Sequence, residues 1–149
     1  MNSHGQPEAR RGPRDAEAEL VVLARWEEHT AWLLDRTTRW PKVLRMTLTQ
    51  RVENEALDVV ALLIRARYRR RGRLAVLEEA NLGLERLRYL LRFARGRSAL
   101  SSKTFEAAIR GIDEVGRMLH GWRQSLAGRT TVCDTAVCDT AAETSGAGR

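Results

Sequence analysis

The sequence predicts an all-α protein folded as an up-down-up-down four-helix bundle, and three observations support this fold class. Leu, Ala, Arg and Glu, which favour helices, dominate the middle of the chain, whereas runs of β-branched residues are nearly absent. Apolar residues recur at intervals of three and four in four long segments. Short connections between these segments favour antiparallel packing of neighbouring helices. With 149 residues and 43% hydrophobic content, the chain can form one core.

The first helix is expected from about Ala18 to Thr38. It ends before Trp40 and Pro41, because proline disfavours helical geometry in the residue before it and has no amide donor. We expect its buried row to consist of Leu20, Leu23, Ala24, Ala31, Leu34 and Thr38, with Trp26 and Leu33 beside that row.

The second helix is expected to begin at a capping box, in which the side chain of Thr47 and that of Gln50 satisfy each other's backbone amides. It should run to about Arg70. Tyr68 follows Ile64 by four residues, so we expect it to continue the packed face. The expected core row of this helix is Val52, Ala56, Val59, Val60, Leu63 and Ala66.

Gly72 is expected to adopt a left-handed conformation after the second helix, with the third helix starting directly after it and running to Arg95. Asn81 interrupts the leucine row of the third helix, and Ser101 or Ser102 should cap the fourth helix. The expected core row of the third helix is Leu74, Leu77, Leu84, Leu87 and Leu91. That of the fourth is Phe105, Ala108, Ile109, Ile112, Val115, Leu119, Trp122 and Leu126.

These patterns divide the chain into a disordered extension (1–18), a four-helix bundle (19–127) and a disordered low-complexity tail (128–149). Cys133 and Cys138 lie in a short repeat of the tail, where a spacing of five without a nearby histidine fits neither a zinc site nor a redox pair. The sequence has no apolar run of transmembrane length and no signal-peptide pattern. We therefore expect a cytoplasmic protein.

The formal net charge of +7 is concentrated in the bundle, since residues 1–19 and 128–149 each contribute −1 and the segment between them contributes +9. Lys42 and Lys103 are the only lysines. Arginine suits phosphates and carboxylates because its planar guanidinium can bond to them in a bidentate way. Base composition of the genome also explains a preference for arginine over lysine, but it does not explain clustering.

The densest cluster holds six arginines within nine residues, at the expected junction of the second and third helices. Its members are Arg65, Arg67, Arg69, Arg70, Arg71 and Arg73. Arginines at the end of a helix also complement the helix dipole, but one or two would suffice for that. We expect the excess to bind nucleic acid or a protein partner.

The sequence shows no catalytic or metal-binding constellation, and we expect neither an enzyme nor a cofactor. His4, His29 and His120 fall in different segments. Di-metal helix bundles use a Glu-x-x-His pattern. Here Glu27 and Glu28 lie two residues and one residue before His29, which points them away from it on a helix.

A second polar set lies on the third helix. Arg88, Arg92 and Arg95 share one face, and Glu85 can pair with Arg88 or reach back to Asn81. A solvated surface row explains most patterns of this kind. Asn81 and Arg88, however, fall at the edge of the leucine row, where polar groups fix register or orient a partner. We include this arginine set among the candidate binding residues and Asn81 and Glu85 among the candidate interface residues.

Glycines inside the expected helices each cost about 1 kcal/mol relative to alanine. We interpret them as sites of close backbone packing, within the bundle or between protomers, although accidental tolerance is the alternative. They are Gly83, Gly111, Gly116 and Gly121.

Several phrases together resemble the accessory variability determinant family of diversity-generating retroelements, within a wider group of four-helix-bundle proteins that also occur in ribosomal RNA intervening sequences. The resemblance covers about residues 19–127. The phrases are Trp40-Pro41-Lys42, Arg45 to Leu48, Leu62 to Tyr68, Ala80 to Tyr89, Gly116 to Leu119 and Gly121-Trp122. His120, the long ends and the dense arginine run depart from the family pattern.

This resemblance implies a noncatalytic bundle that assembles into a basic, barrel-shaped homopentamer. It also implies binding to the retroelement reverse transcriptase and to template RNA or complementary DNA (cDNA), in support of cDNA synthesis during mutagenic retrohoming. Residues in the shared phrases are candidates for structural or interface roles: Trp40, Pro41, Asn81, Glu85, Gly116, Gly121 and Trp122.

Two hypotheses from different classes follow. The first is a reverse-transcriptase accessory protein that binds nucleic acid mainly through phosphates, because the sequence offers no aromatic platform for bases. The second is a protein-only interaction bundle of the intervening-sequence type, whose arginines serve acidic partners or helix ends. A neighbouring reverse transcriptase gene with a variable repeat favours the first, whereas a position within a ribosomal RNA operon favours the second.

Overall fold

The computed structural model describes residues 12–138, except for the side chains of residues 13, 15 and 129–138. Its elements are the α-helices α1 (Pro13–Thr37), α2 (Gln50–Tyr68), α3 (Arg73–Gly96) and α4 (Ser102–Cys138), with a 3₁₀ turn η1 (Lys42–Leu44) and a π-helical turn η2 (Arg45–Thr49) before α2. No strand occurs in this range. The predicted all-α class is confirmed.

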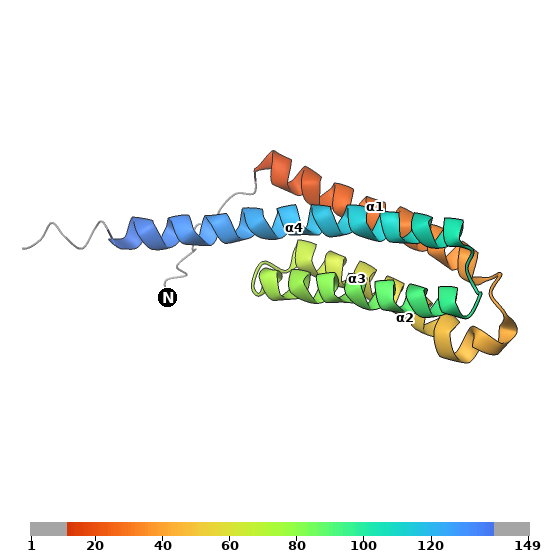
Figure 1. Cartoon of the computed structure of the whole chain (residues 1–149). Helices are drawn as coiled ribbons and strands as arrows, with labels where there is room; N and C mark the ends of the chain where they lie inside the picture. The colour runs from red at the N-terminus through yellow and green to blue at the C-terminus, as the bar shows by residue number, and fades with distance from the viewer. Residues whose placement is uncertain (1–11, 139–149) are drawn as a thin grey trace, which may run out of the picture.

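The helices alternate in direction and form a bundle (Figure 1). Each helix packs on the next one in the chain, and α1 also packs on α4. The α1–α2 and α3–α4 connections therefore lie at one end of the bundle, and the α2–α3 turn lies at the other end. We call these the connector end and the arginine-turn end.

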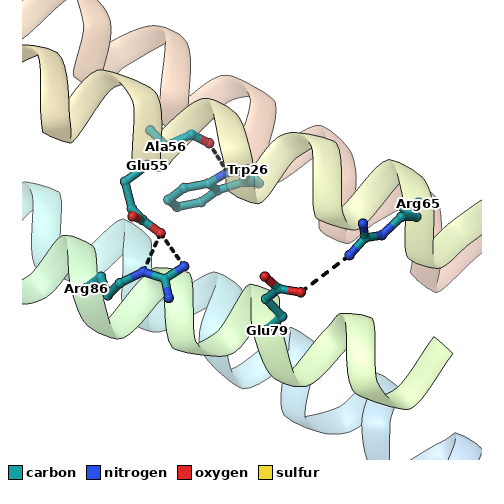
Figure 2. A network of polar contacts seen from close by, with 6 residues as sticks. All are labelled: Trp26, Glu55, Ala56, Arg65, Glu79 and Arg86. Carbon is teal, nitrogen blue, oxygen red and sulfur yellow. Dashed lines mark hydrogen bonds and ion pairs between the residues drawn. The ribbon is translucent and has the colours of Figure 1, made fainter. Parts of the chain in front are cut away.

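One apolar core runs along the bundle. Its fully buried side chains include Trp26 of α1, whose indole N–H donates a hydrogen bond to the carbonyl of Ala56 at 3.0 Å (Figure 2). This bond satisfies the indole where water cannot reach it and fixes the position of α1 on α2. The expected core rows of the last two helices are confirmed at Leu77, Leu84, Leu87, Leu91, Ala108, Ile112, Val115, Leu119 and Trp122.

The predicted core row of α1 was wrong except at Leu23, which is partly buried against the core. Leu20 is 45% exposed, and the residues that face the core are Glu19, Val22, Trp26, Thr30, Leu33 and Thr37. Three members of this row are polar, so counting apolar residues selected a neighbouring row. Thr37 is accommodated because its hydroxyl lies within hydrogen-bond distance of two acceptors, the Leu34 carbonyl and the Glu53 carboxylate, either of which can take its proton. The helix also begins at Pro13, five residues earlier than expected, because proline is well tolerated in a first turn.

The capping box predicted at Thr47 does not form. The chain is already helical from Lys42, so the amides near Thr47 are not at a helix start, and its hydroxyl donates to the Leu44 carbonyl at 3.4 Å. Ser101 does cap α4, since its hydroxyl accepts from the Thr104 amide at 3.1 Å.

The end of α2 also differs from the prediction. The helix ends at Tyr68 rather than near Arg70, and Arg69 is extended. Gly72 has the predicted left-handed conformation, with φ of 73°, and α3 begins directly after it. Tyr68 is 75% exposed and does not continue the packed face, because it lies on the outer side of α2 with Ile64.

Helix α4 continues past the boundary expected at residue 128. Its backbone is helical to Cys138, so Cys133 and Cys138 fall within its last turns. The remaining tail (139–149) and the first residues (1–11) lie outside the described residues, and their expected disorder stays a prediction.

The helix-interior glycines fall into different environments. A Cβ on Gly83 would lie 2.6 Å from a methyl group of Val59, and a Cβ on Gly111 would lie 2.2 Å from the His29 ring. Close packing within the bundle is confirmed for these two. Gly121 has no neighbour within 4 Å of such a Cβ, so a contact with another protomer stays a prediction there.

Candidate nucleic-acid and partner interface

The arginine-turn end presents three consecutive exposed arginines. Arg69, Arg70 and Arg71 occupy the short connection between α2 and α3, and the left-handed Gly72 reverses the chain after them. Both flanking helices are packed, so the three side chains project from a turn whose two ends are fixed. This arrangement is a shaped basic surface and not a run within a loose terminus.

Arg73 does not belong to this surface. Its side chain is 9% exposed and forms an ion pair of 3.3 Å with Glu19, whose side chain is 1% exposed. It also donates to the Arg67 carbonyl at 3.0 Å. The sequence grouped Arg73 with the binding candidates, but its position one residue after the turn directs it inward. Its role is to tie the start of α3 to α1 and to the end of α2.

Two other members of the run have contacts within the chain. Arg65 pairs with Glu79 of α3 at 3.4 Å, and both side chains are about half exposed (Figure 2). The guanidinium of Arg67 lies 5.4 Å from the centre of the Tyr68 ring. A neighbouring pair, Arg86 with Glu55 at 2.8 Å, joins the same two helices. The positive charge on α2 and α3 is thus partly neutralised by carboxylates along these two helices.

The structure brings Asn81, Glu85 and Arg88 together, as the spacing indicated. They line a hollow of about 370 Å³ between α3 and α4, together with Asp113, Gly116, Arg117 and His120. Arg88 donates from Nε and Nη2 to one oxygen of Asp113, at 3.1 and 2.7 Å, and also pairs with Glu85. Sequence reasoning missed Asp113, because no pattern on the fourth helix pairs it with Arg88.

Arg88 is therefore an internal clamp between helices, with 17% of its side chain exposed. Arg92 and Arg95 are exposed and lie over aromatic rings, at 5.1 Å from the centre of Tyr89 and 5.0 Å from that of Phe105. The three arginines expected on one face thus divide into one structural residue and two that remain accessible.

Trp40 and Trp122 are buried, at 7% and 8% exposure, whereas Pro41 is exposed at the start of the connection to η1. Trp122 borders a mostly apolar hollow of about 510 Å³ between the first turns of α1 and residues 118–125 of α4. Their proposed interface roles stay predictions.

His29 packs at the α1–α4 contact. Its ring is stacked on Trp32 and tilted against Trp26, with 5.5 Å between ring centres in both cases, and it lies directly over Gly111. His29 lines a hollow between α1 and α4. The charged residues that line the same hollow are Arg25, Glu28 and Glu114. Burial lowers the pKa of His29 below 6.5, and a backbone hydrogen bond at Ala108 and the charge of Glu114 oppose this only partly.

The stability of the bundle should therefore fall on mild acidification. The unfolded chain takes up a proton at position 29 near pH 6.5, whereas folded His29 stays neutral to lower pH. The free energy of unfolding should decrease as the pH falls through about 6.5 toward the folded pKa. Urea denaturation at a series of pH values should show a weaker decrease for His29→Phe than for the unmodified chain. Equal pH dependence in the two proteins would contradict the assignment.

Among the side chains that the structure describes, no group of three His, Cys, Asp or Glu residues is arranged to hold a metal ion. Nor does any helix in residues 12–138 have the length and apolarity needed to cross a membrane.

The fold and surface define a small basic four-helix-bundle protein with an arginine turn at one end. A protein-family model described as bAvd-like matches residues 20–126, more than two thirds of the chain. The chain therefore belongs to the bAvd-like family, as the resemblance predicted. A search of curated proteins found no match.

Proposed function

We propose that the protein is a noncatalytic accessory factor of a diversity-generating retroelement. It binds the reverse transcriptase and RNA or DNA through basic surfaces, and it supports cDNA synthesis primed on template RNA during mutagenic retrohoming. Membership of the bAvd-like family supports the retroelement context. The observation that carries nucleic-acid binding is the exposed Arg69 to Arg71 turn between two packed helices.

Such a turn suits phosphate backbones more than bases. Three adjacent guanidinium groups offer many fixed donors and a high local positive charge, both of which phosphate oxygens match. Reading of single-stranded bases relies on aromatic side chains that stack on them. Only Tyr68 borders the turn, so contact with phosphates should dominate and sequence preference should be weak.

Self-association into a homopentamer is part of the same proposal. Two apolar rows lie on the outer sides of α2 and α3, each with spacings of seven and four residues, which keep its members on one helix face. They consist of Leu57, Ile64 and Tyr68 on α2, and Leu82, Tyr89 and Phe93 on α3, with exposures between 43% and 75%. Exposed apolar surface of this extent supports contact with other copies of the chain. Fivefold repetition would place the arginine turns in a ring.

Reversal of the turn's charge should weaken nucleic-acid binding strongly. We expect the Arg69→Glu, Arg70→Glu, Arg71→Glu variant to bind a single-stranded RNA roughly 100-fold more weakly near 0.1 M salt, and its log–log salt slope to be shallower by about 2. Fluorescence anisotropy at several salt concentrations measures both quantities.

The matched control reverses the charge of three exposed arginines that lie away from the turn. They are Arg25 on α1, Arg51 on α2 and Arg110 on α4. This variant has the same net charge and should lose much less affinity. Equal losses in the two variants would show that binding depends on total charge and not on the turn.

The second candidate is a protein-only interaction bundle of the ribosomal RNA intervening-sequence type. It is favoured by the intrachain carboxylate pairs of Arg65, Arg73, Arg86 and Arg88, which occupy arginines that would otherwise meet phosphates. Undetectable RNA binding by the unmodified chain, together with a gene position inside a ribosomal RNA operon, would favour this candidate.

A further inference from the structure

The connector end carries the two most exposed large apolar residues among the side chains that the structure describes. Val43 is 79% exposed and Met46 is 77% exposed. Both lie in the η1–η2 segment, which curls away from the axis of α2 at the end of the bundle opposite the arginine turn (Figure 1). Leu44 between them is buried and anchors the segment, so its two exposed neighbours are held outward.

The local backbone at this end is unusual in both connections. The five residues of η2 form a π-helical turn, a form that is rare and often found at functional sites. In the other connection Ser98 has φ of 56°, a left-handed conformation that is uncommon outside glycine. Val43 and Ser98 line one hollow of about 290 Å³ together with Pro41, Leu44, Gly96 and Arg97. The two connections thus build one surface.

Basic side chains surround this surface. Residues 35–49 and 96–103 contain six basic residues and one acid, Asp35, and they include both lysines of the chain. Arg39 is 4.0 Å from Asp35. Among the described residues, no ion pair involves the other exposed members, Lys42, Arg45, Arg97 and Lys103. The result is an apolar pair with a basic rim.

We propose that the connector end docks on a protein that offers an apolar pocket rimmed by carboxylates. Aliphatic side chains at the centre of a patch, with charged groups around them, match the arrangement of protein interfaces. Nucleic acid is a poorer occupant, because aliphatic groups do not stack on bases. A second copy is also a poorer one, because a symmetric contact would place the same positive rims together.

This assignment rests on the proposed function, in which the protein partner is the reverse transcriptase. It separates two kinds of binding at opposite ends of the bundle, the polyanion at the arginine turn and the protein at the connectors. The test uses the reverse transcriptase of the proposed retroelement, treated with nuclease so that RNA cannot bridge the two proteins. Binding is measured by isothermal titration with the full chain.

The test variant is Val43→Ser with Met46→Ser, and the matched control is Leu20→Ser with Val21→Ser, two apolar residues exposed at 45% and 43% on α1. We expect the test variant to bind the reverse transcriptase at least 100-fold more weakly and the control to bind within about threefold of the unmodified chain. RNA affinity, thermal midpoint and light-scattering mass should stay unchanged in the test variant, because both side chains are exposed.

Four results would overturn the inference. If test variant and control bind the reverse transcriptase alike, while the unmodified chain binds it well, the connector end is not the docking surface. A selective loss of RNA affinity in the test variant would assign the surface to nucleic acid, and a lower mass would assign it to self-association. Absence of binding by the unmodified chain would overturn the proposed function itself, and this assignment with it.

Discussion

Replacement of Glu19 by alanine should lower the free energy of unfolding by about 3–5 kcal/mol, the largest stability change expected for a single substitution here. Glu19 and Arg73 are 2% and 8% exposed, and their ion pair connects α1 to the start of α3. Removal of the Glu19 carboxylate breaks an ion pair whose two side chains are both buried, and breaking a buried pair costs far more than the intact pair contributes to stability.

The matched control is Glu79→Ala, which removes the carboxylate of the exposed Arg65–Glu79 pair between α2 and α3. Water solvates the remaining arginine there, so the loss should be about 0–1 kcal/mol. Urea denaturation of both variants measures the difference. Similar losses in the two variants would show that burial does not determine the cost of breaking the Glu19–Arg73 pair.

The second large effect is expected at Gly111. A Cβ there would lie 2.2 Å from the ring of His29, which is confined between Trp26 and Trp32. The ring or the helix must shift, and such overpacking costs about 1–3 kcal/mol even though alanine favours the helix. Gly111→Ala should therefore be destabilised and should show altered tryptophan fluorescence, because the displaced ring touches two indoles.

Gly121→Ala is the control, since nothing lies within 4 Å of its added methyl group and the residue is exposed in the same helix. This variant should gain about 0.5–1 kcal/mol from helix propensity alone. Thermal unfolding of the two variants should thus move the midpoints in opposite directions. A stabilised Gly111→Ala would contradict the tight packing of His29 on α4.

The sequence predicted the helices best where leucine and isoleucine repeat regularly, as in α3 and α4. It failed in α1, because Glu19, Thr30 and Thr37 occupy core positions that only partners on other helices make acceptable. It also failed at Thr47, since a capping motif predicts a helix start only where the preceding chain is not helical, and η1 precedes it.

The candidate site could be predicted in part. The clustering of arginines in the sequence located the arginine turn, and helical periodicity grouped Asn81, Glu85 and Arg88. Both features depend on spacing within one segment of the chain, which the sequence shows directly. The inward direction of Arg73 and the clamp of Arg88 on Asp113 depend on contacts between helices that spacing does not encode. The connector end was missed for the same reason, since its basic residues come from two segments more than 40 residues apart.

Family membership and this geometry together suggest a division of labour within one small bundle. The arginine turn offers a fixed cluster of cations, the outer rows of α2 and α3 offer apolar area for other copies, and the connector end offers an apolar pair with a basic rim. None of these surfaces requires the protein to perform chemistry. An accessory factor of this kind would act by holding an enzyme and its template together.

The most direct test of that account is reconstituted cDNA synthesis. The reverse transcriptase of the proposed retroelement is supplied with its template RNA, with and without the purified chain, and the template-primed cDNA is quantified. We expect such cDNA to depend on the unmodified chain and to be reduced by the Arg69 to Arg71 charge reversal. The same yield with and without the chain would contradict the account.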